Sequence, residues 1–153
     1  MLHAAIYRAP PSSVIVVEAG DVDYALAGGN VCAIAQKRGI VAFILDGVAR
    51  DLAELREIQF PVFARGVIPI PGRNDAMGTL NRPVNCGGVQ VASGDMVVAD
   101  EEGIVVVPAT QLTDVLKAAQ LRAKKEADQT PEEWEAVHHS RIEEILRSKG
   151  FVD

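Results

Sequence analysis

The sequence predicts a single α/β domain of 153 residues, with a core over about residues 1–108 and a helical C-terminal tail over about residues 109–150. Three observations favour this class. Short β-branched runs in the first two-thirds of the chain are typical of strands, whereas the last third carries apolar residues at helical spacing. Glycine and proline cluster between these runs, where turns are expected. No internal repeat or low-complexity linker divides the sequence, and its length suits one domain.

In the first half of the chain, strand-like runs alternate with helix-like ones. We expect three strands where apolar or β-branched runs lie between turn-forming residues, at residues 14–17, 41–45 and 61–65. The second of these is a continuous apolar run between two glycines, which is typical of a strand buried on both faces. Two short helices are expected over residues 31–38 and 51–58. The first of them can begin at Gly29 or Asn30 and ends at Gly39.

The second half begins with an expected long ordered loop over residues 66–87, which are rich in glycine, proline and asparagine. Three short β segments should follow, at residues 89–91, 96–99 and 104–107. The apolar residues then recur at helical spacing, so we expect one helix through residue 126 and another over about residues 130–148. The second helix opens with Thr130 as its N-cap and Glu133 as the capping-box partner.

Composition and charge exclude several classes of protein. The formal net charge of -6 argues against a nucleic-acid groove, because binding phosphates normally requires a basic face. No apolar run approaches the length of a membrane span, and the residues after Met1 do not open a signal peptide. The two cysteines, Cys32 and Cys86, give neither a disulfide framework nor a metal-ligand spacing. We therefore expect a reduced, cytoplasmic protein without a nucleic-acid or membrane partner.

Arg50 and Asp51 are the most informative charged residues in the sequence. They follow the buried strand expected at residues 41–45, and open α/β sheets bind ligands beyond the carboxyl ends of their strands. An arginine there can bind an anionic substrate, and an aspartate can bind a hard divalent cation. This combination makes an enzyme the leading interpretation.

Simpler roles for the same residues remain open. Arg50 and Asp51 could form a surface ion pair at the start of a helix, since short motifs are weakly specific. Glu54 is expected to support Arg50 through an i,i+4 contact rather than to bind a metal. Asp46 could orient Arg50, although a role in a turn at Gly47 is favoured.

A family resemblance emerges from the spacing of Gly29, twenty residues, Arg50-Asp51, two residues and Glu54. This spacing resembles the signature of class II pyruvate aldolases that cleave 4-hydroxy-4-methyl-2-oxoglutarate and 4-carboxy-4-hydroxy-2-oxoadipate. These aldolases share a fold with the RraA proteins, which regulate ribonuclease activity. The resemblance covers about residues 2–126 and includes five further segments, at residues 60–66, 81–84, 86–89, 94–100 and 103–108. It implies an RraA-like β/β/α swivelling-domain-type sandwich with C-terminal helices.

The resemblance also implies roles for individual residues. A divalent metal, magnesium or manganese, would be bound by Asp51, and Arg50 would contact the substrate carboxylate, so these two are the expected catalytic residues. The backbone of the glycine turn is expected to help bind the substrate, through Gly28, Gly29, Asn30 and Val31. In the family, a second metal-shell acid comes from a C-terminal helix of a neighbouring subunit. Glu126 is its expected counterpart here, ahead of Glu102 and Asp128.

The chain departs from the family pattern in two places. Many members carry an acidic residue at the position of Gly29, where this chain has no carboxylate. Members also usually have some tens of residues before the segment that resembles Leu2 to Ala5. Either the start of the sequence is mis-assigned or the N-terminal portion is shortened relative to the family.

The resemblance leads to two hypotheses about function. The first is a metal-dependent aldolase that releases pyruvate from a 4-hydroxy-2-oxo di- or tricarboxylic acid, with oxaloacetate decarboxylation as a side activity. The alternative is a noncatalytic RraA-like regulator that binds a ribonuclease or another protein. In either case the resemblance implies a homo-oligomer, either a trimer or a hexamer.

Overall fold

The computed structural model describes residues 1–72 and 77–151. Residues 73–76, within the loop expected over residues 66–87, lie outside this description. The chain divides into two compact units, Met1–Ala109 and Thr110–Asp153. Within the described residues, no helix combines the length and apolar character that crossing a membrane requires.

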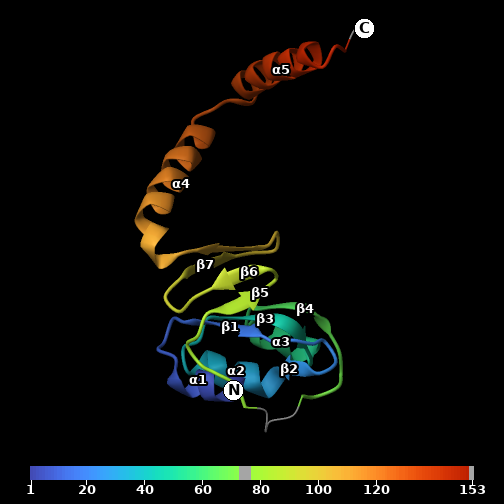
Figure 1. Ribbon diagram of the computed structural model, residues 1–153, viewed down its shortest axis with the longest axis vertical. Helices are drawn as coiled ribbons and strands as arrows, with labels where there is room; N and C mark the ends of the chain where they lie inside the picture. The colour runs from blue at the N-terminus through green and yellow to red at the C-terminus, as the bar shows by residue number, and fades with distance from the viewer. Residues whose placement is uncertain (73–76, 152–153) are drawn as a thin grey trace. The chain divides into compact units, whose positions relative to one another are not determined.

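The first unit is built on a four-stranded parallel sheet (Figure 1). Its central strand is β3 (Ala42–Ala49), and β4 (Val62–Val67) pairs along one side of it. β1 (Val14–Glu18) and β2 (Ala25–Ala27) pair with successive parts of β3 along its other side. Because β3 is covered on both faces, its sequence is a nearly continuous apolar run, as expected for a buried parallel strand.

The expected end of the central strand at residue 45 is wrong, because β3 continues to Ala49. Gly47 lies inside the strand, where an added Cβ would be 2.8 Å from the Cβ of Ala19. Glycine is therefore required at this position by close packing rather than by a turn. The turn role favoured for Asp46 is wrong for the same reason, since Asp46 lies within β3 and pairs with Arg65 of β4.

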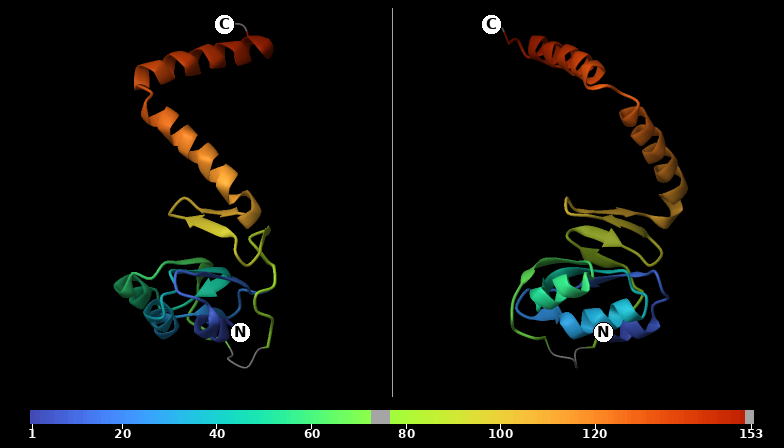
Figure 2. Two further views of the ribbon diagram at one scale, coloured as in Figure 1. Left: turned by 90° about the vertical axis from the view of Figure 1, so that its left-hand side faces the viewer. Right: turned by 180° about the vertical axis from the view of Figure 1, so that it is seen from behind.

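Three helices cover one face of this sheet (Figures 1 and 2). They are α1 (Leu2–Arg8), α2 (Gly29–Lys37) and α3 (Leu52–Ile58). The core between the helices and the sheet centres on Phe43, which is fully buried and meets the ring of Phe60 edge to face, with centroids 5.0 Å apart. This layer holds the start of α2 and the start of α3 near the carboxyl end of β3.

The opposite face of the sheet is covered by two antiparallel hairpins (Figures 1 and 2). One hairpin joins β5 (Val84–Cys86) to β6 (Val89–Val91), and the other joins β7 (Met96–Ala99) to β8 (Ile104–Val107). The last three strands match the sequence prediction, whereas β5 and the end of β4 fall in the expected loop. The unit is thus layered β/β/α, as the resemblance implies.

The second unit consists of helices whose side chains are almost all exposed. After a short 3-10 helix at Ala109–Gln111, it contains α4 (Leu112–Ala127) and α5 (Pro131–Ser148), neither of which has a buried residue. The predicted capping box is confirmed. Thr130 Oγ1 accepts a hydrogen bond from the Glu133 amide at 3.2 Å, and Glu133 Oε2 accepts one from the Thr130 amide at 3.1 Å.

Candidate active site

Arg50 and Asp51 follow β3 directly, at its carboxyl end. The backbone amide of Arg50 donates to the carbonyl of Ala27 at 2.9 Å, which holds this point of the chain against the end of β2. The next residues form α3, with Asp51 at its N-cap. The structure therefore places the two predicted residues beyond a buried central strand, in the position where open α/β sheets bind ligands.

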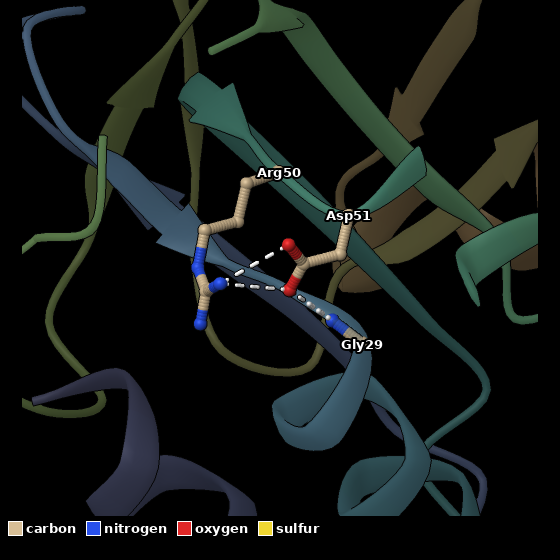
Figure 3. Close-up of polar contacts among 3 residues, drawn as sticks. All are labelled: Gly29, Arg50 and Asp51. Carbon is tan, nitrogen blue, oxygen red and sulfur yellow. Dashed lines mark hydrogen bonds and ion pairs between the residues drawn. The ribbon is translucent and has the colours of Figure 1, made fainter. Parts of the chain in front are cut away.

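The backbone of Asp51 is unusual and its side chain does not cap its own helix. Asp51 has left-handed torsion angles, φ 61° and ψ 44°, which cost a non-glycine residue about 1–3 kcal/mol and are common at functional sites. Its Oδ2 atom accepts a hydrogen bond from the Gly29 amide at 3.0 Å (Figure 3). Because Gly29 is the first residue of α2, Asp51 caps the neighbouring helix and joins it to the end of the sheet.

The glycine turn is packed against two carboxylates. A Cβ added at Gly28 would collide with Oδ2 of Asp51, and one added at Gly29 would collide with Oε2 of Glu54. Gly28 has an extended backbone that any residue can adopt, so the requirement for glycine is steric. Glu54 thus fills the space beside Gly29, the position at which family members often carry an acid.

Arg50 pairs with its neighbour Asp51 rather than with Glu54. Its Nη1 atom lies 3.0 Å from Oδ1 and 3.0 Å from Oδ2 of Asp51 (Figure 3). Among the polar contacts of the described residues, none joins Arg50 to Glu54, so the i,i+4 support expected for Arg50 is wrong. The side chains of Arg50 and Asp51 are 38% and 24% exposed, which leaves the pair accessible to a ligand from solvent.

The start of α2 offers backbone donors beside this pair. The first intrahelical hydrogen bond runs from the Cys32 amide to the Gly28 carbonyl, so the amides of residues 29–31 have no acceptor within the helix. That of Gly29 is used by Asp51. Those of Asn30 and Val31 have no acceptor among the contacts of the described residues, and free amides at a helix start favour an anion.

Cys32 lies on the buried side of the same helix turn and is inert. Burial, and to a smaller extent the negative charge of Asp51, raises the pKa of the Cys32 thiol to about 12. The thiol is therefore protonated at neutral pH and cannot act as a nucleophile.

The donor set at this turn fits a hard divalent cation. Asp51 and Glu54 supply carboxylate oxygens, and Mg²⁺ is commonly held by one or two carboxylates with water or substrate completing its shell. In residues 1–72 and 77–151, no group of three or more histidine, cysteine, aspartate or glutamate side chains is placed to hold a metal ion. The residues present thus suit an open site rather than a closed cage.

Glu126, the predicted second metal-shell acid, belongs to the second unit. There it lies in α4 and forms an i,i+4 ion pair with Arg122, with 2.8 Å between Nε and Oε1. Its role toward a metal on a neighbouring subunit stays a prediction.

A separate cavity of about 840 Å³ lies between the sheet and the hairpins. Its lining includes Ile44, Phe63, Cys86 and the Asp46–Arg65 ion pair, but neither Arg50 nor Asp51. The Arg65 hydrogen bond lowers the pKa of Asp46, while burial raises the pKa of Cys86. Sequence reasoning missed this ion pair, although an aspartate within a buried apolar strand was a signal that a cationic partner had to lie nearby.

Comparison with known proteins gives a consistent result. The RraA-like family, described as Aldolase/RraA, matches residues 1–106. A relative from Halalkalibacterium halodurans, provisionally named a 4-hydroxy-4-methyl-2-oxoglutarate aldolase, is 38% identical over 150 residues, which is 97% of this chain and 68% of that protein. The 4-hydroxy-4-methyl-2-oxoglutarate aldolase of Thermus thermophilus is 32% identical over 89 residues, 58% of this chain and 54% of that protein.

A solved structure shows the same fold. The RNA-processing inhibitor RraA from Thermus superposes with a TM-score of 0.66 and 28% identity, over 70% of this chain and 66% of that one. The chain thus spans between about half and about two-thirds of the length of these three proteins. The matched segment includes the glycine turn, Arg50, Asp51 and Glu54, together with both β layers. From its sequence and its fold, the chain belongs to the RraA-like family, which includes aldolases and RraA proteins.

Proposed function

We propose that this protein is a divalent-metal-dependent class II aldolase that cleaves a 4-hydroxy-2-oxo di- or tricarboxylic acid and releases pyruvate. The observation that carries the proposal is the meeting of Arg50, Asp51 and Glu54 with the glycine turn at the end of β3. A pure binding module has no evident need for two carboxylates and an arginine packed on a glycine turn. The names of two relatives support an aldolase activity.

Each group of the site has a role in this reaction. The guanidinium of Arg50 binds the substrate carboxylate, and the free amides of Asn30 and Val31 favour the same negative charge. Asp51 would hold a magnesium or manganese ion, with the carboxylate of Glu54 packed against the same glycine turn. When bound, the cation supplies Lewis-acid stabilisation of the charge that carbon–carbon cleavage leaves on the 2-oxo acid. Decarboxylation of oxaloacetate leaves the same charge, so we expect it as a side activity.

The alternative is a noncatalytic regulator that binds a ribonuclease or another protein. The observation in its favour is the structural similarity to the RNA-processing inhibitor RraA. In that case the Arg50–Asp51 pair serves only to join α2 to the sheet, and a divalent cation has no specific effect.

Pyruvate release decides between the two functions. We would measure it from 4-hydroxy-4-methyl-2-oxoglutarate and from oxaloacetate, with Mg²⁺ or Mn²⁺ and then with a chelator. Metal-dependent release that is lost in Asp51→Asn, with the fold retained by circular dichroism, supports the aldolase. Glu57→Gln is the matched control, since it removes an exposed carboxylate from the same helix. Turnover that survives Asp51→Asn, or no turnover by the folded protein, would contradict the assignment.

A further inference from the structure

We infer that Arg50 and a divalent cation compete for the Asp51 carboxylate, so that cation binding releases Arg50 and makes its guanidinium available to an anionic ligand. The inference rests on the proposed function, because it takes Asp51 as the residue that binds the cation. It adds an order of events: the cation binds first and the anion second. Arg50 then occupies Asp51 until the cation binds, and afterwards binds the substrate.

The hydrogen bonds of Asp51 leave little room for a further partner. Nη1 of Arg50 bridges both carboxylate oxygens at 3.0 Å each, and Oδ2 also accepts from the Gly29 amide at 3.0 Å (Figure 3). An ionised carboxylate has about four acceptor positions; hydrogen bonds from Arg50 and Gly29 take one on each oxygen, and the ion-pair contact of Nη1 crowds Oδ2 further. A cation that approaches an oxygen to about 2.1 Å requires direct access to one of those positions.

Charge repulsion strengthens the competition. A cation on one oxygen and a guanidinium nitrogen 3.0 Å from the same oxygen would lie within about 5 Å of each other. This separation is below the Debye length of about 8 Å at physiological ionic strength, and the Asp51 side chain is only 24% exposed, so dissolved salt screens the repulsion weakly.

The two partners of Asp51 differ in their freedom to move. The Gly29 amide is fixed, because it belongs to the first turn of α2 and the turn is packed against Asp51 and Glu54. The Arg50 side chain is long and 38% exposed, so it can rotate away from Asp51 at little cost. The guanidinium is therefore the partner that a cation displaces.

Release places the guanidinium where an anion can use it. Arg50 remains anchored by its backbone bond to Ala27, and its side chain lies against Gly28 at the start of α2. A carboxylate ligand can then take both parallel donors of the guanidinium fork, which the pair with Asp51 occupies in part. Cation and anion binding become positively coupled through Arg50, and the coupling acts equally in both directions.

The test follows Arg50 directly in the intact 153-residue chain. We would label the arginines with ¹⁵N, assign the side-chain signal of Arg50 through Arg50→Lys, and titrate with Mg²⁺ alone while measuring binding by calorimetry. We expect the Arg50 Nε–Hε signal to shift and sharpen in step with Mg²⁺ occupancy. Arg38 serves as the internal control, because its guanidinium donates to the carbonyls of Ile6 and Tyr7 and should not respond.

A pair of matched variants measures the strength of the competition. Arg50→Gln should raise the affinity for Mg²⁺ by at least about fivefold, the lower end of typical coupling between sites. Arg65→Gln removes the same charge from another arginine–aspartate pair of the same sheet, and should leave Mg²⁺ affinity nearly unchanged. Circular dichroism establishes that both variants are folded.

The outcomes separate the inference from the proposed function. Mg²⁺ binding that depends on Asp51 but leaves the Arg50 signal unchanged, or equal effects of the two arginine variants, overturns the competition while the metal site stands. Absence of saturable binding, or binding that persists in Asp51→Asn, overturns the metal site at Asp51 and the competition with it.

Discussion

At the scale of single residues, the site depends on two positions that carry no side chain. Gly28 and Gly29 allow the carboxylates of Asp51 and Glu54 to approach the start of α2 within contact distance. A methyl group at either position would displace the acid that faces it. The glycines therefore determine where the acids lie, although they have no chemistry of their own.

Gly28→Ala should separate Asp51 from α2. The added Cβ collides with Oδ2 of Asp51, so we expect the hydrogen bond to Gly29 to break and the protein to lose about 1–3 kcal/mol of stability. Metal-dependent turnover should fall with it. Urea denaturation and the pyruvate assay check these effects. Gly66→Ala is the control, since its added Cβ would lie 3.7 Å from Val48 in ordinary contact; equal losses in both variants would contradict the steric role of Gly28.

Cys32 should make stability depend on alkaline pH. Its folded-state pKa of about 12 exceeds the ordinary value of 9.0, so the fold favours the protonated thiol. This contribution is complete below about pH 9 and is lost as the pH rises toward 12, with a slope of up to about 1.4 kcal/mol per pH unit. We expect the free energy of unfolding to fall more steeply between pH 9 and 11 in the wild type than in Cys32→Ala. Parallel curves would show that the thiol titrates normally.

At the scale of helices and strands, the sequence was informative wherever a local pattern was strong. The β-branched runs predicted β1, β4 and β6–β8, and the capping box predicted the start of α5. By contrast, α1 and β2 were not predicted. The seven-residue helix α1 is completed by Arg38, which donates to the carbonyls of Ile6 and Tyr7 from 32 and 31 residues away along the chain, and β2 is the tripeptide Ala25–Ala27. Tertiary contacts form both elements, and periodicity cannot reveal such contacts.

The candidate site shows the same division. The position of Arg50 and Asp51 after a buried strand could be predicted, because the apolar run before them is local. The hydrogen bond from Gly29 to Asp51 and the approach of Glu54 to Gly29 could not be predicted, because both depend on how α2 and α3 meet. From its position before α3, the side chain of Asp51 would be expected to cap α3. In the structure it caps α2 instead.

Thr130→Ala should weaken α5 alone. The substitution removes one half of the capping box, which contributes about 1 kcal/mol to a helix. Since α5 has no buried residue, little packing compensates for the loss, and we expect faster amide exchange within α5 but unchanged exchange in the first unit. Thr113→Ala is the matched control in α4, where no capping bond is lost. Unchanged exchange in α5 would show that an oligomer contact holds the helix instead.

At the scale of the whole molecule, the second unit indicates assembly. Neither α4 nor α5 has a buried residue, and α5 carries large exposed apolar side chains at helical spacing, including Trp134, Val137 and Ile145. Exposed apolar stripes of this kind mark interaction surfaces. We propose that copies of this chain associate through them, as a trimer or hexamer.

Light scattering after gel filtration tests this assembly. We expect a mass of three or six times the 16.3 kDa of one chain. The double change Val137→Asp and Ile145→Asp should shift the protein toward smaller species, because it places charge on the apolar stripe. Arg147→Asp, on the polar side of the same helix, should leave the mass unchanged. A monomeric wild type would contradict both the assembly and a contribution of Glu126 to a neighbouring site.

The cap that Asp51 provides to α2 bears on how the family could diversify. Asp51 stabilises the fold through hydrogen bonds with the Gly29 amide and the Arg50 guanidinium, both of which belong to the chain itself. A descendant could thus abandon substrate and cation together without exposing an uncompensated charge or loosening the end of the sheet. Loss of catalytic activity would leave the fold stable. The surface that bound the substrate would then be open to selection for recognising other macromolecules. Because the contacts of Asp51 come from the chain itself, such a transition would change the free energy of folding little.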